Sequence, residues 1–503
     1  MMIMNILKRN FSVSAIANKS SLIAERFPIT VVFVVGVACL FFIMINDGSK
    51  LSYKFWIFCS AGVFVSLAAS LCAEDLFNAF KTQCITLIAA LLWGVYCFFL
   101  PAESKDVSLS KGIEIGVLCA VSVFLVFFIS FLKKDMDKAF WNFTTKTLFQ
   151  LALAGVFGMI FWSGLSLAIL AIQQLFDVKI DHKIYTNLAT VCYVLFSPIY
   201  FLANIPYKTE KHDDEIQPNN VLKILALYIL TPILATYAVI LYAYLFKIIV
   251  AWELPNGWVS WLVSALGSGG LIVIALLFPL RLREENRFVV LLSRYMGLFI
   301  LPLLVLMSIG IFRRIGDYGI TINRCYILLL NLWFYGIYTY IFITKSKHIK
   351  WILISPIIVA LLSSVGFWCM ANVTQKVRTA EISAYFNDRQ MTIEEAKSMF
   401  SEMAEKERER IKSNFEYLHK TYGEESVQPF FSQDIQEFSR NTAYFDTENI
   451  NEAKFFSERD IDKLKIVAFK TGYPIVIITK VIMGILIRER YIKENGIDVD
   501  DLS

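Results

Sequence analysis

The chain has 503 residues, of which 57% are hydrophobic and 18% are charged. A soluble globular protein carries roughly a quarter charged residues, so this composition excludes an ordinary soluble domain. The formal net charge is only +5, and the sequence holds no basic stripe of the kind that binds nucleic acid, so nucleic acid is not expected as a partner. Residues 1–370 hold 29 Lys and Arg against 19 Asp and Glu, whereas residues 371–503 hold 19 against 24. The sequence therefore divides into a basic, apolar part and an acidic tail.

The N-terminal stretch, residues 1–28, combines Lys8, Arg9, Lys19 and Arg26 with scattered apolar residues. A cleavable signal peptide would have a continuous apolar core and a small-residue cleavage site, and this stretch has neither. It predicts a cytoplasmic surface segment that leads into the first membrane span.

From residue 29 to residue 370, apolar runs of roughly 18–25 residues alternate with short charged links, and runs of this length cross a bilayer as helices. Backbone polar groups cannot stay unpaired in lipid, so the runs must be helical. The sequence thus predicts an all-α polytopic membrane bundle of about 11 transmembrane helices. The predicted spans are Ile29–Ile45, Trp56–Cys72, Cys84–Leu100, Ile113–Leu132, Leu148–Ile172, Ile184–Ile205, Val221–Val250, Trp258–Leu280, Tyr295–Phe312, Cys325–Phe342 and Trp351–Met370.

The orientation follows from the basic residues of the loops. The loops on the same side as the N-terminus carry roughly twice as many Lys and Arg as the loops on the other side, which favours a cytoplasmic N-terminus. An odd number of spans then places residues 371–503 on the extracytoplasmic side.

Signatures of enzyme or metal chemistry are weak. None of the nine cysteines forms a Cys-x-x-Cys pair, and the four histidines lie in different segments. No catalytic residue, metal ligand or cofactor is therefore predicted. The loop His212-Asp213-Asp214-Glu215 could bind a divalent ion, but its charge pattern is more typical of a solvated loop.

One stretch between two predicted spans concentrates polar and charged groups, and we call residues 313–324 the Arg313–Arg324 mouth. Arginine forks match the oxygens of carboxylates and phosphates, so the mouth could hold a small anion or a lipid headgroup. The alternative, which Gly316 and Gly319 favour, is a salt-bridged turn that fixes the angle between two helices. The candidate binding residues are Arg313, Arg314, Asp317, Tyr318, Asn323 and Arg324.

Two further features bear on transport. The cluster Gly267-Ser268-Gly269-Gly270 is predicted to interrupt an apolar helix, as in transporter sites, although glycine clusters more often permit close helix packing. Asn331 is predicted to make an interhelical hydrogen bond rather than to bind a ligand. Ionisable side chains are scarce within the spans, which argues against a proton-coupled carrier.

The tail, residues 371–503, is predicted to form a small mixed α/β extramembrane domain. Thr392 and Glu395 have the spacing of a capping box, apolar residues then recur at helical spacing, and Gly423 stands where a helix would end. The apolar run Tyr473–Ile487 could be a twelfth span, but it is short and contains Pro474 and Lys480. We interpret it as part of a soluble core.

Several segments carry a family resemblance. The segment Tyr318-Gly319-Ile320-Thr321-x-Asn323-Arg324, followed by Ile327–Leu332 and Trp333, resembles a signature of the bacterial integral membrane family known as domain of unknown function 4153 (DUF4153). Further similar segments are Arg26-Phe27-Pro28, Leu361-Leu362-Ser363-Ser364-x-Gly366-x-Trp368, and Tyr417-Leu418 through Gly423 to Gln428-Pro429-Phe430. The chain departs from the family pattern at Ile322, where an acidic residue is usual, and at Cys325, where an aromatic residue is usual. The resemblance implies a multi-pass protein of the bacterial cytoplasmic (inner) membrane with an extramembrane tail, and it brings no activity with it.

The leading functional hypothesis is a non-enzymatic protein of the cell envelope. It would lie in the lipid bilayer and bind or sense a partner or ligand through its tail and the Arg313–Arg324 mouth. One alternative is a permease for a small solute that uses the Gly267–Gly270 cluster. Another is a membrane enzyme acting on lipid-linked substrates, which would need an acidic site.

Overall fold

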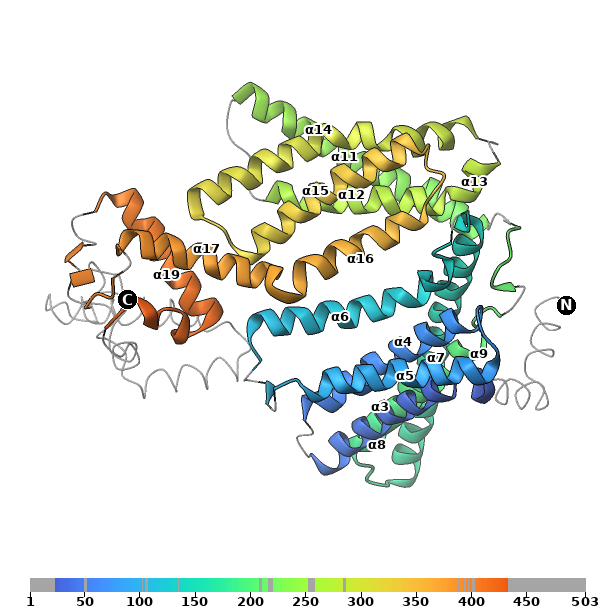
Figure 1. Ribbon diagram of the computed structural model, residues 1–503. Coiled ribbons are helices and arrows are strands. Elements are labelled where there is room, and N and C mark those ends of the chain that lie inside the picture. Colours follow the sequence, from blue (N-terminus) through green and yellow to red (C-terminus); the bar gives the residue numbers. More distant parts are fainter. Residues whose placement is uncertain are drawn as a thin grey trace, which may run out of the picture. The chain divides into compact units, whose positions relative to one another are not determined.

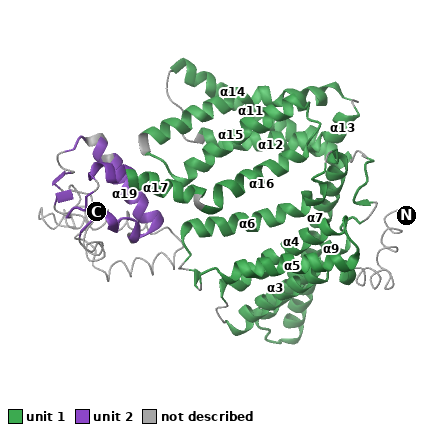
Figure 2. Cartoon of the chain, viewed as in Figure 1, with its two compact units in different colours: residues 1–380 green, residues 381–503 purple. Residues whose placement is uncertain are grey.

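The computed structural model of the protein describes residues 23–432, with gaps at 49–51, 102, 105–106, 134, 208–209, 216–219, 252–257, 284–285, 388, 393–394, 397 and 400–402. The chain divides into two compact units, residues 1–380 and residues 381–503 (Figure 2). We refer to them as the membrane unit and the tail unit. The predicted domain boundaries at residues 28 and 370 stay a prediction.

Ten helical segments among the described residues are long and apolar enough to cross a membrane (Figure 1). This makes the chain a multi-pass helical membrane protein. The segments are α3 (Pro28–Asp47), α4 (Tyr53–Ala73), α5 (Ala79–Phe98), α6 (Leu109–Phe128) with η2 (Ile129–Phe131), α7 (Asp137–Phe176), α8 (His182–Ala189) with η3 (Thr190–Phe196) and α9 (Ser197–Ala203), α10 (Asn220–Lys223) with η5 (Ile224–Leu230) and α11 (Thr231–Ala251), α12 (Trp258–Leu276), α14 (Arg287–Tyr318) and α15 (Ile322–Ile343). A short helix, α13 (Phe278–Leu282), links α12 to α14.

The last predicted span, Trp351–Met370, is shorter in the structure than the sequence suggested. Helix α16 (Lys350–Ser364) has only 15 residues. It is followed by the short 3₁₀ segment η6 (Gly366–Trp368), and Gly366 has a left-handed φ of 78°, a conformation that glycine adopts without strain. A separate helix, α17 (Met370–Tyr385), then begins. The prediction of about 11 spans is therefore corrected to ten that meet the length requirement among the described residues.

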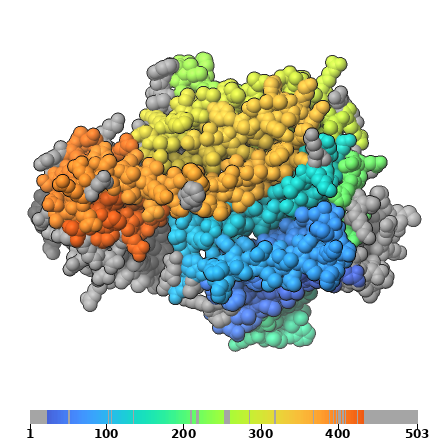
Figure 3. Space-filling model, in the orientation of Figure 1, coloured from blue at the N-terminus to red at the C-terminus, as the bar shows by residue number. Residues whose placement is uncertain are grey.

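The membrane unit contains two large apolar cores. One is built by α3, α4, α6, α7 and α9, and the other by α11, α12, α14 and α15. Helix α16 follows α15 in the chain, yet it packs mainly along α6 and only sparsely on α15. The two helices α6 and α16 lie side by side in the ribbon view, and their surfaces border one another in the space-filling view (Figures 1 and 3). Helix α16 therefore lies at the seam between the two cores.

The glycine cluster Gly267–Gly270 lies within α12, which continues through it without a break. The prediction of an interrupted helix is thus wrong, and the prediction of close packing is confirmed. A Cβ atom on Gly267 would lie 3.0 Å from the buried ring of Phe334 in α15. The hydroxyl of Tyr338 donates to the carbonyl of Gly267 at 2.6 Å, so the missing side chains let α12 and α15 approach closely.

The interhelical role predicted for Asn331 is confirmed. Its side chain is buried and donates to the Ser308 hydroxyl on α14 at 2.7 Å. A polar side chain in the apolar interior is stabilised when it finds such a partner.

The tail unit is helical where the structure describes it. The predicted capping box is present, because the Thr392 amide donates to Glu395 Oε2 at 2.9 Å and the Glu395 amide to Thr392 Oγ1 at 3.3 Å. Helix α19 (Glu405–Tyr422) ends at Gly423, whose φ is 83°. The core collects Ile382, Phe386, Ala396, Ile411, Phe415, Leu418, Val427, Phe430 and Phe431.

The mixed α/β fold predicted for the tail is not found in its described part. The only strand-like pairing there is an isolated bridge between Met391 and Phe431. Phe430 and Phe431, which follow Pro429, pack their rings beside Phe415 of helix α19. The run Tyr473–Ile487 lies outside the described residues.

Candidate functional site

The Arg313–Arg324 mouth is the junction between α14 and α15. Helix α14 extends past its predicted end at Phe312 and carries Arg313 and Arg314, which are exposed, on its last turns. Asp317 and Tyr318 complete the helix, and their side chains lie outside the described part of the structure. Asn323 is exposed on the first turn of α15. The structure thus brings the predicted residues to one helix junction, and their role in binding stays a prediction.

Two arginines donate to successive carbonyls of the turn between these helices. Arg324 Nη1 donates to the Gly319 carbonyl at 2.6 Å, and Arg378 Nε donates to the Ile320 carbonyl at 2.6 Å. Thr321 begins α15 by accepting from the Arg324 amide at 3.4 Å. Cations near the carboxyl end of a helix also interact favourably with its dipole. This geometry favours the structural interpretation of Arg324, which holds the turn.

Arg378 was not among the predicted residues. It belongs to α17 and is only 1% exposed, so its guanidinium is enclosed by protein. A Cβ atom on Gly319 would lie 3.2 Å from Arg378 Nη2, and Gly319 has a left-handed φ of 73°. Glycine is therefore required at this position for both space and backbone conformation. In the sequence Lys376 and Arg378 both follow the last predicted span, and no spacing connects Arg378 with residue 320.

A second polar cluster, which we call the Arg26–Lys211 network, joins the amino end of α3 to the carboxyl end of α4. Arg26 binds Glu74 through two hydrogen bonds of 2.9 Å and also donates to the carbonyl of Ile205 at 2.9 Å. The fully buried Lys211 ammonium donates to Glu74 Oε1 at 2.9 Å and to Asp75 Oδ2 at 2.8 Å. Charges of opposite sign alternate through the network, which is how buried ions are tolerated.

The loop that could have bound a divalent ion is engaged in protein contacts. His212 Nε2 lies 2.9 Å from Asp75 Oδ1, and Asp213 accepts from the Glu215 amide at 3.0 Å and from Lys146 at 3.3 Å. These two donors, the Glu215 amide first, hold the pKa of Asp213 below its usual value. Among the described residues no group of three His, Cys, Asp or Glu could hold a metal ion.

A third cluster fixes the start of α16. Asp137 Oδ1 accepts from the Lys350 amide at 3.1 Å, and Oδ2 lies 3.1 Å from His348 Nδ1. The buried Lys350 ammonium donates to the carbonyl of Phe131 at 3.4 Å. These contacts attach the amino end of α16 to η2 and α7.

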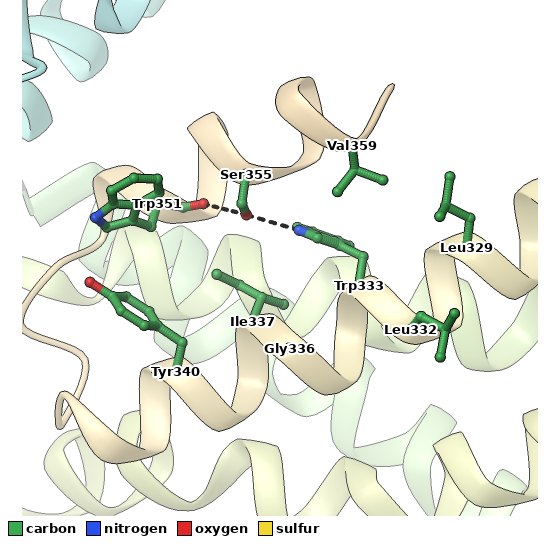
Figure 4. A pocket seen from close by; sticks show the side chains of 9 residues that line it. All are labelled: Leu329, Leu332, Trp333, Gly336, Ile337, Tyr340, Trp351, Ser355 and Val359. Atoms are coloured by element: carbon green, nitrogen blue, oxygen red, sulfur yellow. Dashed lines mark hydrogen bonds between the residues drawn. The ribbon is translucent and has the colours of Figure 1, made fainter. Parts of the chain in front are cut away.

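An apolar groove of about 580 Å³ lies between α15 and α16 (Figure 4). The polar side chains at its centre bond within the protein, since the Trp333 indole donates to the Ser355 hydroxyl at 2.8 Å and Ser355 donates to the Trp351 carbonyl at 2.6 Å. The groove is lined by Leu329, Leu332, Trp333, Gly336, Ile337, Tyr340, Trp351, Ser355 and Val359. We call it the α15–α16 groove.

A smaller cavity of about 260 Å³ lies between α3, α4, α7 and α9. Ser197 borders it, and its hydroxyl donates to the carbonyls of Ala154 and Cys192 at 2.9 and 3.0 Å. The cavity adjoins the π-helical segment η3, which is followed by Pro198. Its remaining lining is almost entirely apolar.

The ten membrane-length helices among the described residues define a multi-pass membrane protein. Residues 29–401 match the family described as Domain of unknown function (DUF4153), and the chain belongs to that family. The resemblance deduced from the sequence is thereby confirmed.

Comparison with curated and solved proteins adds little about activity. The chain is 26% identical over 209 residues to an uncharacterised protein of Pasteurella multocida (strain Pm70). The match covers 41% of this chain and 35% of the relative, so the chain spans about a third of that protein's length. No solved structure matches the chain.

Proposed function

We propose that this protein is a non-enzymatic binding or sensing protein of the bacterial cell envelope. The observation that carries the proposal is the position of Arg378. Its buried guanidinium binds the turn of the Arg313–Arg324 mouth, and its helix, α17, continues from Met370 to Tyr385 across the boundary between the two units.

This arrangement suits the transmission of a signal. Helix shifts are one way in which proteins switch between states. In the middle of α17 Arg378 holds the Ile320 carbonyl, and one turn earlier Thr374 Oγ1 lies 3.8 Å from Cys325 Sγ. A ligand or protein that binds the tail unit and shifts α17 would therefore alter the mouth.

We propose that the tail lies on the extracytoplasmic side of the membrane and that the N-terminus lies in the cytoplasm. This requires α16 to cross the membrane although it is short. Two contacts support a crossing: the Tyr340 and Trp351 rings meet at one end with centroids 6.5 Å apart, and the Tyr326 and Ser364 hydroxyls lie 2.8 Å apart at the other. Helix α16 thus runs antiparallel to α15 along most of its length, and η6 extends its reach.

The two alternatives have less support. The predicted permease would use the Gly267–Gly270 cluster, but α12 continues through this cluster without a break and packs there against α15. The cavity beside η3 offers a solute little polar contact, because the Ser197 hydroxyl that borders it donates to two backbone carbonyls. An enzyme acting on lipid-linked substrates would need a reactive acid, and the carboxylates of Glu74 and Asp75 are bound by buried cations.

The proposal is tested with a photo-crosslinking amino acid at Glu416, an exposed position of α19, in the full-length protein in living cells. A binding protein gives one discrete cross-linked product, which disappears when the same probe is placed at Leu332 on the membrane-facing surface. The rate at which Cys325 is alkylated is then compared between cross-linked and free protein by mass spectrometry.

We expect partner capture to change the alkylation of Cys325, and we expect Arg378→Gln to abolish that change. An unchanged rate in the unmodified protein would refute sensing through α17. If no discrete product forms at Glu416 or at the nearby exposed Lys420, binding through this face of the tail is refuted.

A further inference from the structure

The geometry points to the α15–α16 groove as a binding site for one acyl chain of an anionic phospholipid. The inference is independent of the function proposed for the tail. It rests on the shape of the groove, on the chemistry of its lining and on the charge at one end.

The groove runs between two contacts that join α15 and α16. The Tyr340 and Trp351 rings close one end, and the hydrogen bond between Tyr326 and Ser364 joins the helices beyond the other. From Leu329 to Tyr340 the lining spans 11 helical steps, or roughly 16 Å. Half of a typical hydrocarbon core is about 15 Å thick, so the groove matches the depth of a single leaflet.

The lining suits hydrocarbon rather than a polar solute. The two polar side-chain atoms at its centre, Trp333 Nε1 and Ser355 Oγ, satisfy one another and the Trp351 carbonyl (Figure 4). The Tyr340 hydroxyl and the Trp351 indole N–H lie at one end, and the remaining lining groups are apolar. Away from that end a polar solute would lose its hydration without gaining partners, whereas an acyl chain loses nothing.

The α15–α16 groove exists because α16 does not pack closely against α15, the helix that precedes it in the chain. Helix α16 packs mainly on α6, and Gly336 contributes no side chain to the space between α15 and α16. Leu332, on the rim, is 58% exposed. Solvent cannot fill an apolar groove inside a bilayer, so a lipid chain is the occupant that restores close packing.

The headgroup preference follows from the connecting loop. Residues 344–349 join α15 to α16 and pass the end of the groove where Tyr340 and Trp351 lie (Figure 4). Lys345 and Lys347 are exposed on this loop. The nearby carboxylate of Asp137 is bound by the Lys350 amide and His348. Aromatic rings at the membrane interface followed by exposed lysines are the features that attract an anionic headgroup.

The test uses the full-length protein in phosphatidylcholine vesicles that contain a trace of phosphatidylglycerol carrying a photoreactive acyl chain. A phosphatidylcholine probe with the same chain serves as the comparison. Adducts are mapped by mass spectrometry. We expect them to concentrate in residues 329–340 and 351–359, with the anionic probe favoured by roughly five-fold for each lysine that contacts the headgroup.

Two pairs of variants make the assignment specific. In Gly336→Leu the added Cβ has no other atom within 4 Å and Gly336 lines the groove, so the larger side chain should occupy it, and adduct formation there should be lost while the fold is kept. Gly164→Leu, on the exposed face of α7 with equal space around it, is the matched control and should leave adducts unchanged. Replacing Lys345 and Lys347 with Gln should reduce the anionic preference, whereas Lys138→Gln should not.

Three results would overturn the inference. Adducts spread evenly over all lipid-facing helices would mean ordinary contact with bulk lipid. Equal labelling by both probes would show that the site has no preference for an anionic headgroup. A cross-link between two copies of the chain through α15 and α16, with no lipid adduct there, would assign the groove to a dimer interface.

Discussion

Arg378 and Lys211 are 1% and 0% exposed, and both donate to groups just beyond the carboxyl ends of helices, α14 for Arg378 and α4 for Lys211. Removing a cation from water is costly unless its donors are paired with good geometry. Lys211 meets two carboxylates, and Arg378 meets a backbone carbonyl at the carboxyl end of α14. In both cases a cation donates hydrogen bonds to acceptors that have no partner within the helix or turn. These residues hold the ends of the helices in place, and the apolar helix surfaces contribute the bulk of the packing.

Replacing Lys211 with Ala is expected to destabilise the protein by about 3–5 kcal/mol, because it leaves buried carboxylates without their cation. The matched control is Lys146→Ala. Its ion pair with Asp213 has side chains that are 47% and 36% exposed, so its loss should cost about 0–1 kcal/mol. Thermal unfolding of the two variants in detergent provides the measurement. Equal shifts of the unfolding midpoint would contradict a buried network.

Replacing Arg378 with Ala is expected to cost about 1–3 kcal/mol, the penalty for leaving the part-buried Ile320 carbonyl without this donor. Lys376→Ala, at an exposed position of the same helix, should be close to neutral. Because Thr374 loses its fixed position beside Cys325, alkylation of Cys325 should also become faster in the arginine variant. If stability and alkylation both stay at wild-type values, Arg378 does not hold the turn.

At the scale of elements, the close approach of α12 to α15 depends on small residues. In lipid, helices gain little from hiding apolar surface, so association depends on close packing and interhelical hydrogen bonds. Gly267 and Gly270 provide the space, and the Tyr338 hydroxyl provides a bond across it. The seam between α15 and α16 has the opposite character, because Gly336 faces open space and the helices meet only at separated contacts.

The substitution Gly267→Ala should therefore be destabilising by about 1–3 kcal/mol, the usual cost of overpacking. The new methyl group would lie 3.0 Å from the fully buried Phe334 ring, so that ring would have to shift within a packed core. Gly164→Ala adds the same methyl group to α7 where no atom lies within 4 Å, and it should be neutral or slightly stabilising. A comparison of unfolding midpoints decides the matter, and equal midpoints would refute the tight α12–α15 contact.

At the scale of the whole molecule, the helices could be predicted from the sequence and their partners could not. Hydropathy located the ten long spans because each one must be apolar over its whole length. The capping box at Thr392 and the end of α19 at Gly423 were also predictable, since both depend on a few neighbouring residues. The contact of Arg378 with residue 320 depends on packing across 58 residues, and no local spacing encodes it. The short α16 was missed because Val365, Phe367 and Trp368 extend the apolar run beyond the residue where the helix ends.

The side of the membrane on which the tail lies depends on whether α16 crosses the bilayer. Comparing the compartments of two positions on either side of α16 tests this for either overall orientation of the protein. A 15-residue helix is about 22 Å long, which falls short of a core of about 30 Å. Its contacts with α15 near both ends nevertheless show that α16 runs antiparallel to α15 over most of its length.

Compartment-specific reporters fused after Lys347 and after Ser432 are separated only by α16 and the tail helices. We expect opposite compartments, with the reporter after Lys347 cytoplasmic. The same compartment for both would show that α16 turns back within the membrane, and a third fusion after Ser503 that differs from the one after Ser432 would assign a crossing to Tyr473–Ile487.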